Sequence, residues 1–371
     1  MNRQRERIVR SARGSSILVA CLVACLVAWF APLSLAADPA DGGAPGETAE
    51  ISAECRAFRE DREADLGDVM RAGCEPTLAQ MSALMDNPLG NVAMWINQVD
   101  WLRLDNDQNS RSAENQVNYM GIFQFPVGIS EDWNTINRIV YSVPSSPIDQ
   151  GDADRLAGFG PSQPGPGGPT QPPSGGGTLP IDLIDGRTTG FGDMYYVGFL
   201  SPKKGIKHEN GGTSVWGIGL DASFPTATDD LLGSGRFSMG PTALYAYLGK
   251  EWKLAGLLQT YFDYAGDDDR DDVSLMNLQV FYYYSLSETV SIGAGPNIIA
   301  NFETGSRDRW TVPIGWGINK TFQVGKLPVR VGLEYFYSLE RPHSVGADHN
   351  LRFYVIPAVA SAILPKWMLG R

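Results

Sequence analysis

The chain contains few of the residues on which metal and nucleophilic chemistry depend. Its 371 residues include three histidines and four cysteines, and charged residues make up 19%, below the ~25% usual for soluble domains. Acidic residues outnumber basic ones by 42 to 30, whereas a nucleic-acid-binding protein needs a basic surface that neutralises phosphates. The composition therefore excludes nucleic acid as a partner, and we expect no cofactor and no metal site.

Long hydrophobic runs are also scarce, and the one that stands out lies near the amino terminus. Five arginines between residues 3 and 13 precede an apolar run from Ile17 to Ala31, which is followed by the small-residue site Ser34-Leu35-Ala36. Fifteen residues rise ~22 Å in a helix, too short for a ~30 Å hydrocarbon core. This order is typical of a secretory signal peptide. We predict a signal peptide over residues 1–36, cleaved near Ala36.

The four cysteines divide between two segments. Cys21 and Cys25 lie inside the predicted signal, where the apolar run continues beyond both and so argues against lipidation. Cys55 and Cys74 lie in the acidic stretch 37–91, which we predict to be a periplasmic arm with a short charged helix over residues 51–71. Exported thiols can oxidise, so Cys55 and Cys74 are candidates for a disulfide that would stiffen the arm by ~3 kcal/mol. Two free thiols are the alternative.

From residue 92 onward, apolar and polar side chains alternate with a period of two. Between Val290 and Asn301, for example, one face carries Ile292 and Ile298, and the other carries Ser291 and Asn297. Because successive strand side chains point to opposite faces, each such segment has one apolar wall and one small or polar wall. Most segments have 10–13 residues, longer than the ~5–6 of soluble strands and long enough to cross a bilayer at a tilt. The segments are 94–104, 116–126, 133–143, 191–201, 214–224, 237–248, 252–264, 274–284, 289–301, 309–322, 328–339 and 349–360.

The connections between these segments alternate between short and long. Short turns such as 249–251 and 286–288 alternate with longer polar loops, the longest being the Pro- and Gly-rich stretch 144–190. This alternation is typical of a transmembrane barrel with both termini in the periplasm, whereas a soluble sandwich could share the period alone. A closed barrel leaves no unpaired strand edge in lipid. We therefore predict an all-β fold, a transmembrane antiparallel β-barrel of about 12 strands over residues 92–365, followed by a tail at 366–371.

Several stretches of the chain recur in one order as landmarks of a known family. They are Trp133–Arg138, Gly190–Asp193, Phe224–Asp230, Leu232–Gly235 and Trp310–Gly315. In this order they resemble the outer-membrane transporters grouped under the MetA pathway of phenol degradation, from about residue 80 to Pro365. The resemblance implies an outer-membrane β-barrel whose substrate is poorly defined. The Pro-rich insert at 160–177 lies outside the family pattern.

An enzyme is one alternative to a channel, and the sequence argues against it. Ser201-Pro-Lys-Lys204 fits the S-x-x-K pattern, but it lies in a predicted turn and lacks the partner motifs of that class. A barrel phospholipase would need Ser and an oriented His on its lipid-facing wall. His208 lies in a predicted turn, and His343 and His349 flank a loop. We therefore do not expect an enzyme.

We predict a passive channel or transporter for small molecules in a Gram-negative outer membrane, with aromatic or hydrophobic solutes as the candidates. A structural or surface-interaction barrel without a pore is the alternative. The expected partners are outer-membrane lipids and lipopolysaccharide, the barrel-assembly machinery and a small-molecule solute; the oligomeric state stays open. Polar residues inside a barrel set its selectivity, although Arg330 and Glu334 could simply pair to fill the lumen. The lumen candidates are Asp221, Gln259, Tyr261, Asp263, Asn297, Arg330 and Glu334.

Overall fold

A computed structural model describes residues 52–60, 69, 72–90, 92–105, 114–148, 186–325 and 327–359. The chain divides into two compact units, Met1–Ile51 and Ser52–Arg371, and every described residue belongs to the second. The predicted signal peptide, most of the 144–190 loop and the tail at 366–371 lie outside the described residues. No helix in the described part of the chain is long and apolar enough to cross a membrane.

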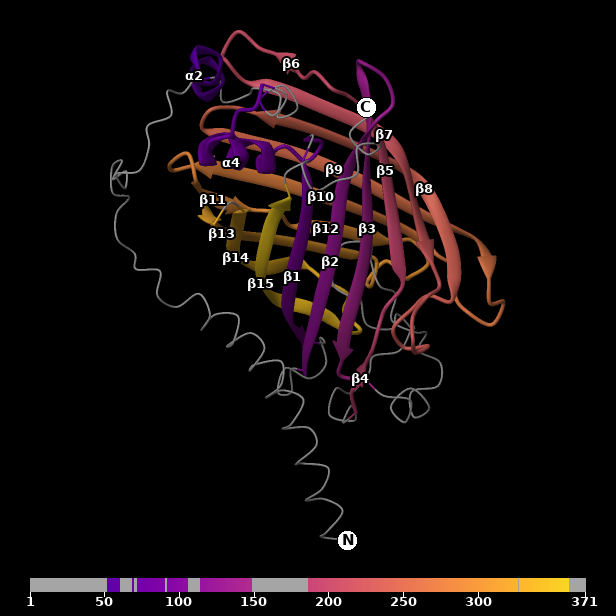
Figure 1. The fold of residues 1–371 in the computed structure, drawn as a ribbon. Coiled ribbons are helices and arrows are strands. Elements are labelled where there is room, and N and C mark those ends of the chain that lie inside the picture. The colour runs from indigo at the N-terminus through magenta and orange to yellow at the C-terminus, as the bar shows by residue number, and fades with distance from the viewer. Residues whose placement is uncertain are drawn as a thin grey trace. The chain divides into compact units, whose positions relative to one another are not determined.

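Antiparallel strands form one closed sheet in which each strand pairs with the next along the chain (Figure 1). β15 pairs with β1, and this contact closes the ring. β11 and β12 both lie between β10 and β13 and together make one interrupted strand, so the described barrel has twelve. The strands are β1 (Ala93–Asp105), β2 (Glu114–Gly128), β3 (Trp133–Ser146), β5 (Met194–Pro202), β7 (Thr213–Phe224), β8 (Arg236–Leu248), β9 (Trp252–Gly266), β10 (Ser274–Ser285), β11 (Val290–Ala294), β12 (Asn297–Asn301), β13 (Trp310–Val324), β14 (Leu327–Glu340) and β15 (Gly346–Val359), with short additions at β4 (Thr188–Thr189) and β6 (Ile206–Lys207).

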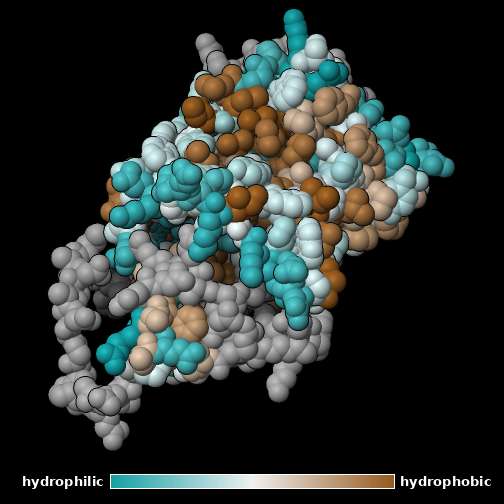
Figure 2. Space-filling view, turned by 90° about the horizontal axis from the view of Figure 1, so that it is seen from above, coloured by the Kyte–Doolittle hydropathy of each residue, from teal (hydrophilic) through white to brown (hydrophobic). Residues whose placement is uncertain are grey.

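The outer wall of the sheet is apolar as the period of two predicts, but the inner wall is not uniformly small or polar, because large apolar side chains such as Phe199 and Leu244 are buried there. On β7, Ile218 and Leu220 are 56% and 60% exposed on the outside, whereas Asp221 is fully buried inside. Figure 2 shows one face of the molecule, on which hydrophobic side chains gather in a broad patch with hydrophilic ones towards its edges. A soluble sandwich would bury such side chains between two sheets, so this outer wall fits lipid. The predicted transmembrane barrel of about 12 strands is confirmed.

The short turns lie where the sequence predicts them. Residues 249–251 join β8 to β9, and 286–289 join β10 to β11. In the turn after β13, Gly325 has a φ of +61°, a left-handed conformation that glycine adopts without steric cost. β1 begins and β15 ends at the same end of the barrel as these turns, because Ala93 pairs with Val359. In outer-membrane barrels the end with the short turns faces the periplasm, and this end of the barrel is named the periplasmic end on that basis.

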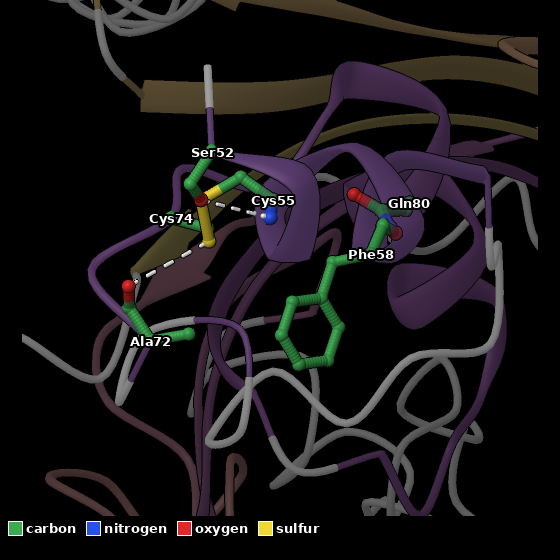
Figure 3. The surroundings of a disulfide bond; sticks show 6 residues. All are labelled: Ser52, Cys55, Phe58, Ala72, Cys74 and Gln80. Carbon is green, nitrogen blue, oxygen red and sulfur yellow. Dashed lines mark hydrogen bonds between the residues drawn. A yellow bond between two sulfur atoms is a disulfide. The ribbon is translucent and has the colours of Figure 1, made fainter. Parts of the chain in front are cut away.

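Among the described residues ahead of the barrel lie the helices α2 (Ala53–Glu60) and α4 (Leu78–Asp86). α2 covers the first part of the predicted 51–71 helix, and residues 61–68 lie outside the described residues. α4 begins with a capping box in which Thr77 and Gln80 exchange backbone–side-chain hydrogen bonds of 2.8 and 3.2 Å. Cys55 and Cys74 form a disulfide with their Cα atoms 5.5 Å apart (Figure 3), which ties α2 to the segment before α4.

Candidate functional site in the barrel interior

α4 lies against the inner wall at the periplasmic end of the barrel. The Ser82 hydroxyl donates to Thr321 Oγ1 of β13 at 3.2 Å. Arg330 of β14 donates through Nη2 to the Ser82 carbonyl oxygen at 2.9 Å. Thr321 and Arg330 are register partners whose side chains point inward. The arm predicted from the sequence is therefore not separate from the barrel, because its last helix covers the periplasmic mouth.

The last residue of α4 provides the electrostatic anchor of this helix. Asp86 forms ion pairs with Arg330 at 2.8 Å and with Lys253 of β9 at 2.6 Å, and all three side chains are mostly buried. Lys253 also donates to Ser285 Oγ at 2.7 Å. A carboxylate at a helix C-terminus is locally unfavourable, because that end of the helix dipole is negative. Asp86 therefore stabilises the docking of α4 on the barrel and not the helix itself.

The members of a second charged group lie side by side on the inner wall of three neighbouring strands, β14, β15 and β1. Arg352 of β15 pairs with Asp100 of β1 at 2.9 Å and with Glu334 of β14 at 3.7 Å. The Tyr283 hydroxyl donates to Glu334 Oε1 at 2.6 Å, and Arg352 Nη1 donates to the Gly295 carbonyl oxygen at 2.9 Å. The three charged residues are at most 3% exposed. Because every charge here has a partner of opposite sign, the layer can remain buried inside the barrel.

Loops pack against the inner wall at the extracellular end. Leu231 from the loop after β7 and Val345 from the loop after β14 pack with Leu102 and Leu104 of the inner wall. The loop after β7 is fixed by the buried carboxylate of Asp193. This carboxylate accepts N–H bonds from Thr226, Ala227 and Ser234 at 3.0, 3.1 and 2.7 Å. Burial raises the pKa of the Asp193 carboxyl, and these hydrogen bonds lower it in part. These loops thus add an apolar cluster to the inner wall at the end of the barrel away from α4.

A cavity of about 170 Å³ lies in the lumen between α4 and the inner wall. Its lining is mixed, because basic side chains and apolar or aromatic ones both reach it. The basic residues come from four strands of the barrel, β3, β9, β14 and β15, and α4 contributes Asp86. The lining includes Met85, Asp86, Met94, Ile96, Ile122, Gln124, Arg138, Lys253, Phe281, Arg330, Glu334 and Arg352.

The structure places all seven predicted lumen residues on the inner wall but in separate groups. Gln259 Nε2 donates to the Tyr261 hydroxyl at 3.2 Å, and both side chains face the Asp221 carboxylate. These three residues form one group on β7 and β9. Arg330 and Glu334 line the cavity.

The remaining two candidates lie outside both groups, and one suggested pairing is wrong. Asp263 faces Arg236 near the extracellular end at 3.8 Å, and Asn297 is buried at 4% exposure on β12. Arg330 and Glu334 do not pair with each other, because α4 supplies the carboxylate for Arg330 and β15 supplies the cation for Glu334.

Sequence reasoning missed five charged residues of the interior: Asp86, Asp100, Arg138, Lys253 and Arg352. Asp100, Arg138 and Arg352 each interrupt a predicted strand at a position of inward parity. That parity was the available signal, because a charge inside a membrane-spanning segment belongs on the lumen side. Asp86 carries no such signal, since it lies in the arm.

The structure brings one serine and one histidine together, at a place that does not favour catalysis. His208 Nε2 lies 2.7 Å from Ser214 Oγ, which also lies 2.7 Å from the Tyr245 hydroxyl. Ser214 is 1% exposed, so a substrate has no access to it. Ser201 of the S-x-x-K match donates its hydroxyl to the Trp216 carbonyl oxygen at 2.9 Å. Within the described ranges, no cluster of three or more His, Cys, Asp or Glu side chains could hold a metal ion.

Comparison with models of known protein families shows to which family the chain belongs. The family model described as "Putative MetA-pathway of phenol degradation" matches residues 152–347, slightly more than half of the 371 residues. The chain belongs to this family. The match to the MetA-pathway family confirms the resemblance seen in the sequence landmarks. No curated protein matches the chain.

Solved structures similar to this MetA-pathway family member are outer-membrane barrels. An outer-membrane channel from Pseudomonas putida F1 is 14% identical, with a TM-score of 0.50 over 72% of this chain and 96% of that one. Outer membrane phospholipase A from Escherichia coli is 12% identical, with a TM-score of 0.35 over 76% of this chain and 96% of that one. A FadL homologue from Pseudomonas aeruginosa is 9% identical, with a TM-score of 0.32 over 76% of this chain and 92% of that one. At such identities the first match shows the fold, that of an outer-membrane β-barrel.

Proposed function

We propose that the protein is a passive outer-membrane channel or transporter for small hydrophobic molecules, aromatic ones included. The observation that supports this most is the apolar lining of the interior. Inward-facing Ile136, Val197, Phe199, Leu244 and Leu257 form a buried cluster across β3, β5, β8 and β9. Water-filled porins have a polar interior, and a polar solute would lose its hydration beside such side chains. An apolar solute loses little there, so the wall favours hydrophobic cargo.

The described residues narrow both ends of the lumen, so we take this structure as a constricted state of the proposed channel. α4 lies in the periplasmic end, where Asp86 and Ser82 hold it, and the apolar cluster around Leu231 lies at the other end. Passage requires α4 or the loop after β7 to move. The polar lumen residues, including Arg330 and Glu334, would then set which solutes pass.

Uptake into liposomes tests the proposal. Liposomes that contain the purified barrel should take up toluene faster than protein-free liposomes, and glucose uptake should stay at the protein-free rate. Planar bilayers should show small current steps when voltage is applied. Uptake of both solutes at the protein-free rate, together with the absence of current steps, would reject the channel.

A barrel without a pore, acting in surface interaction or structure, is the second candidate. The narrowing at both ends favours it. Deletion of residues 78–86 separates the two proposals, because removal of α4 opens one end of the lumen. A channel should then conduct more than the full-length protein. A pore-free barrel should stay silent in both forms.

The remaining assignments concern the export of the protein, its segments outside the barrel and its partners. We propose that residues 1–36 are a cleaved signal peptide, 37–91 a periplasmic arm and 366–371 a tail. The Cys55–Cys74 disulfide fits an oxidising periplasm. Lipopolysaccharide and the barrel-assembly machinery are the expected partners of an exported barrel, and we propose no enzymatic activity. Separation of the outer membrane from the other membrane fractions tests the location. Heat-modifiable migration on gels then shows whether the protein in that fraction is a folded barrel.

A further inference from the structure

One wall of the cavity contains a buried hydrogen-bond donor that has no partner. Gln124 of β2 and Arg138 of β3 are register partners, and Arg138 Nε donates to Gln124 Oε1 at 2.8 Å. Gln124 is fully buried, and its Nε2 group has no hydrogen-bond partner. An unsatisfied buried donor is unfavourable. An acceptor oxygen on a molecule in the cavity would satisfy it.

The charges that line the cavity are also unequally matched. Lys253 and Arg330 pair with Asp86, and Arg352 pairs with Glu334. Arg138 differs from these three cations, because its side-chain hydrogen bonds run to neutral oxygens, those of Gln124 and of the Pro88 carbonyl at 3.1 Å. Asp221 acts on Arg138 electrostatically without an ion-pair contact. Among the described residues, Arg138 is thus the lining cation without a carboxylate in contact, and it lies beside the unsatisfied Gln124 donor.

Apolar side chains continue directly from this pair of donors. Met94 of β1 is the register partner of Gln124, and Ile96 is the register partner of Ile122. All of these residues line the cavity, and Phe281 of β10 also reaches it. The cavity volume of about 170 Å³ is close to the ~150 Å³ of an apolar protein cavity that holds benzene. A donor pair therefore opens on a cavity whose whole volume is about that needed by one ring and whose adjoining wall is apolar.

We infer that this cavity binds a small hydrophobic carboxylate, such as a single ring that carries one carboxyl group. The carboxylate accepts hydrogen bonds from Gln124 Nε2 and from the Arg138 guanidinium, and the apolar body lies on Met94, Ile96 and Ile122. The inference rests on the proposed channel and refines its cargo: neutral hydrocarbons fit the apolar lining, and a hydrophobic acid is held at Arg138 and Gln124.

Binding of benzoate to the purified full-length barrel in detergent tests the inference. Isothermal titration and saturation-transfer NMR should give a benzoate dissociation constant at least about 10-fold lower than that of neutral benzamide or toluene, because a charged hydrogen bond is lost with either. Equal affinity for benzoate and toluene, or no benzoate binding, would overturn the carboxylate site. Toluene uptake into liposomes reports on the channel separately, so failure of the site and failure of the channel are distinguishable.

Three variants make the test specific to the donor pair. Gln124→Glu gives Arg138 a carboxylate from the chain itself and should abolish benzoate binding, while Gln124→Leu removes the donor and should weaken binding about 10-fold. Arg236→Gln is the control, since it removes the same charge outside the cavity, and it should bind benzoate as the wild type does. Heat-modifiable migration confirms that each variant is folded. Unchanged benzoate affinity in a folded Gln124→Glu or Gln124→Leu protein would refute the assignment.

Discussion

Replacement of Asp86 by Asn should release α4 from the periplasmic mouth. The change keeps the size of the side chain but removes the charge that holds Lys253 and Arg330 at 2.6 and 2.8 Å. Breaking a buried pair from one side costs about 3–5 kcal/mol because the other charge stays uncompensated. Two cations are left here, in a site that is not completely dry, so we take the lower figure. A loss of about 3 kcal/mol shifts the equilibrium between docked and released α4 by roughly 100-fold.

Two assays report this release independently. In planar bilayers, Asp86→Asn should conduct more, or open more often, than the wild type. In a Ser82→Cys background, a maleimide should label residue 82 much faster, because Ser82 is 3% exposed while α4 is docked. The helix itself should not unfold, since removal of a negative charge at its C-terminus is favourable. Any gain in labelling is therefore due to undocking.

Matched variants test whether the ion pairs of Asp86 hold α4 on the barrel. Asp86→Glu retains the charge and should stay close to the wild type in both assays. Combining Asp86→Asn with Lys253→Met and Arg330→Met removes the uncompensated cations and should restore part of the docking. Wild-type conductance and labelling in Asp86→Asn would mean that the packing of Met85 and its neighbours, and not the ion pairs, holds α4. The electrostatic anchor would then be refuted.

Three further predictions concern stability. Ile218→Arg, on the lipid-facing wall, should cost about 2–4 kcal/mol if that site is near the bilayer midplane and lower the yield of heat-modifiable folded barrel; Glu209→Arg in the adjacent turn is the control, and an equal yield from both would contradict the assignment of the outer wall. Cys74→Ser should lower the stability of the arm by about 3 kcal/mol and speed limited proteolysis before residue 78, whereas an unchanged cleavage rate would show that packing alone holds the arm. Asp193→Asn replaces one carboxylate oxygen, which accepts backbone N–H bonds, with an NH2 group that donates. The loop after β7 should lose about 1–3 kcal/mol of stability, measured as faster amide exchange at Ser234. Unaltered exchange would count against the role of that carboxylate.

The barrel could be predicted from the sequence because the alternation of apolar and polar side chains is a local property. The alternate apolar residues of a single strand identify its outer wall. On β13, for example, these are Ile314, Trp316 and Ile318, which are 49–55% exposed. Short turns then indicate the order and direction of the strands, because two strands joined by a tight turn run antiparallel side by side. The same parity placed candidates such as Glu334 inside the barrel without reference to any other strand.

The partners of the interior charges could not be predicted in this way. Parity gives the wall to which Arg330 and Glu334 belong, but the register of β14 on β15 decides that Glu334 lies opposite Arg352, and the docking of α4 decides that Arg330 meets Asp86. Arg138 was overlooked because its importance depends on what its neighbour Gln124 lacks. A lone pattern of inward residues does not show which donors remain without a partner.

The sequence by itself determined that this chain folds as a membrane barrel with an apolar outer wall, because a strand in lipid must hide its polar side chains on one face. It predicted a small or polar inner wall, and only the structure shows that part of that wall is apolar. Tertiary structure decided what narrows the lumen and what the cavity can hold. Asp86 meets Lys253 and Arg330 only when α4 lies in the mouth of the closed sheet. These contacts join residue 86 to residues 253 and 330, which are far from it along the chain. A local sequence pattern does not encode such contacts, because they form only when the sheet closes into a ring.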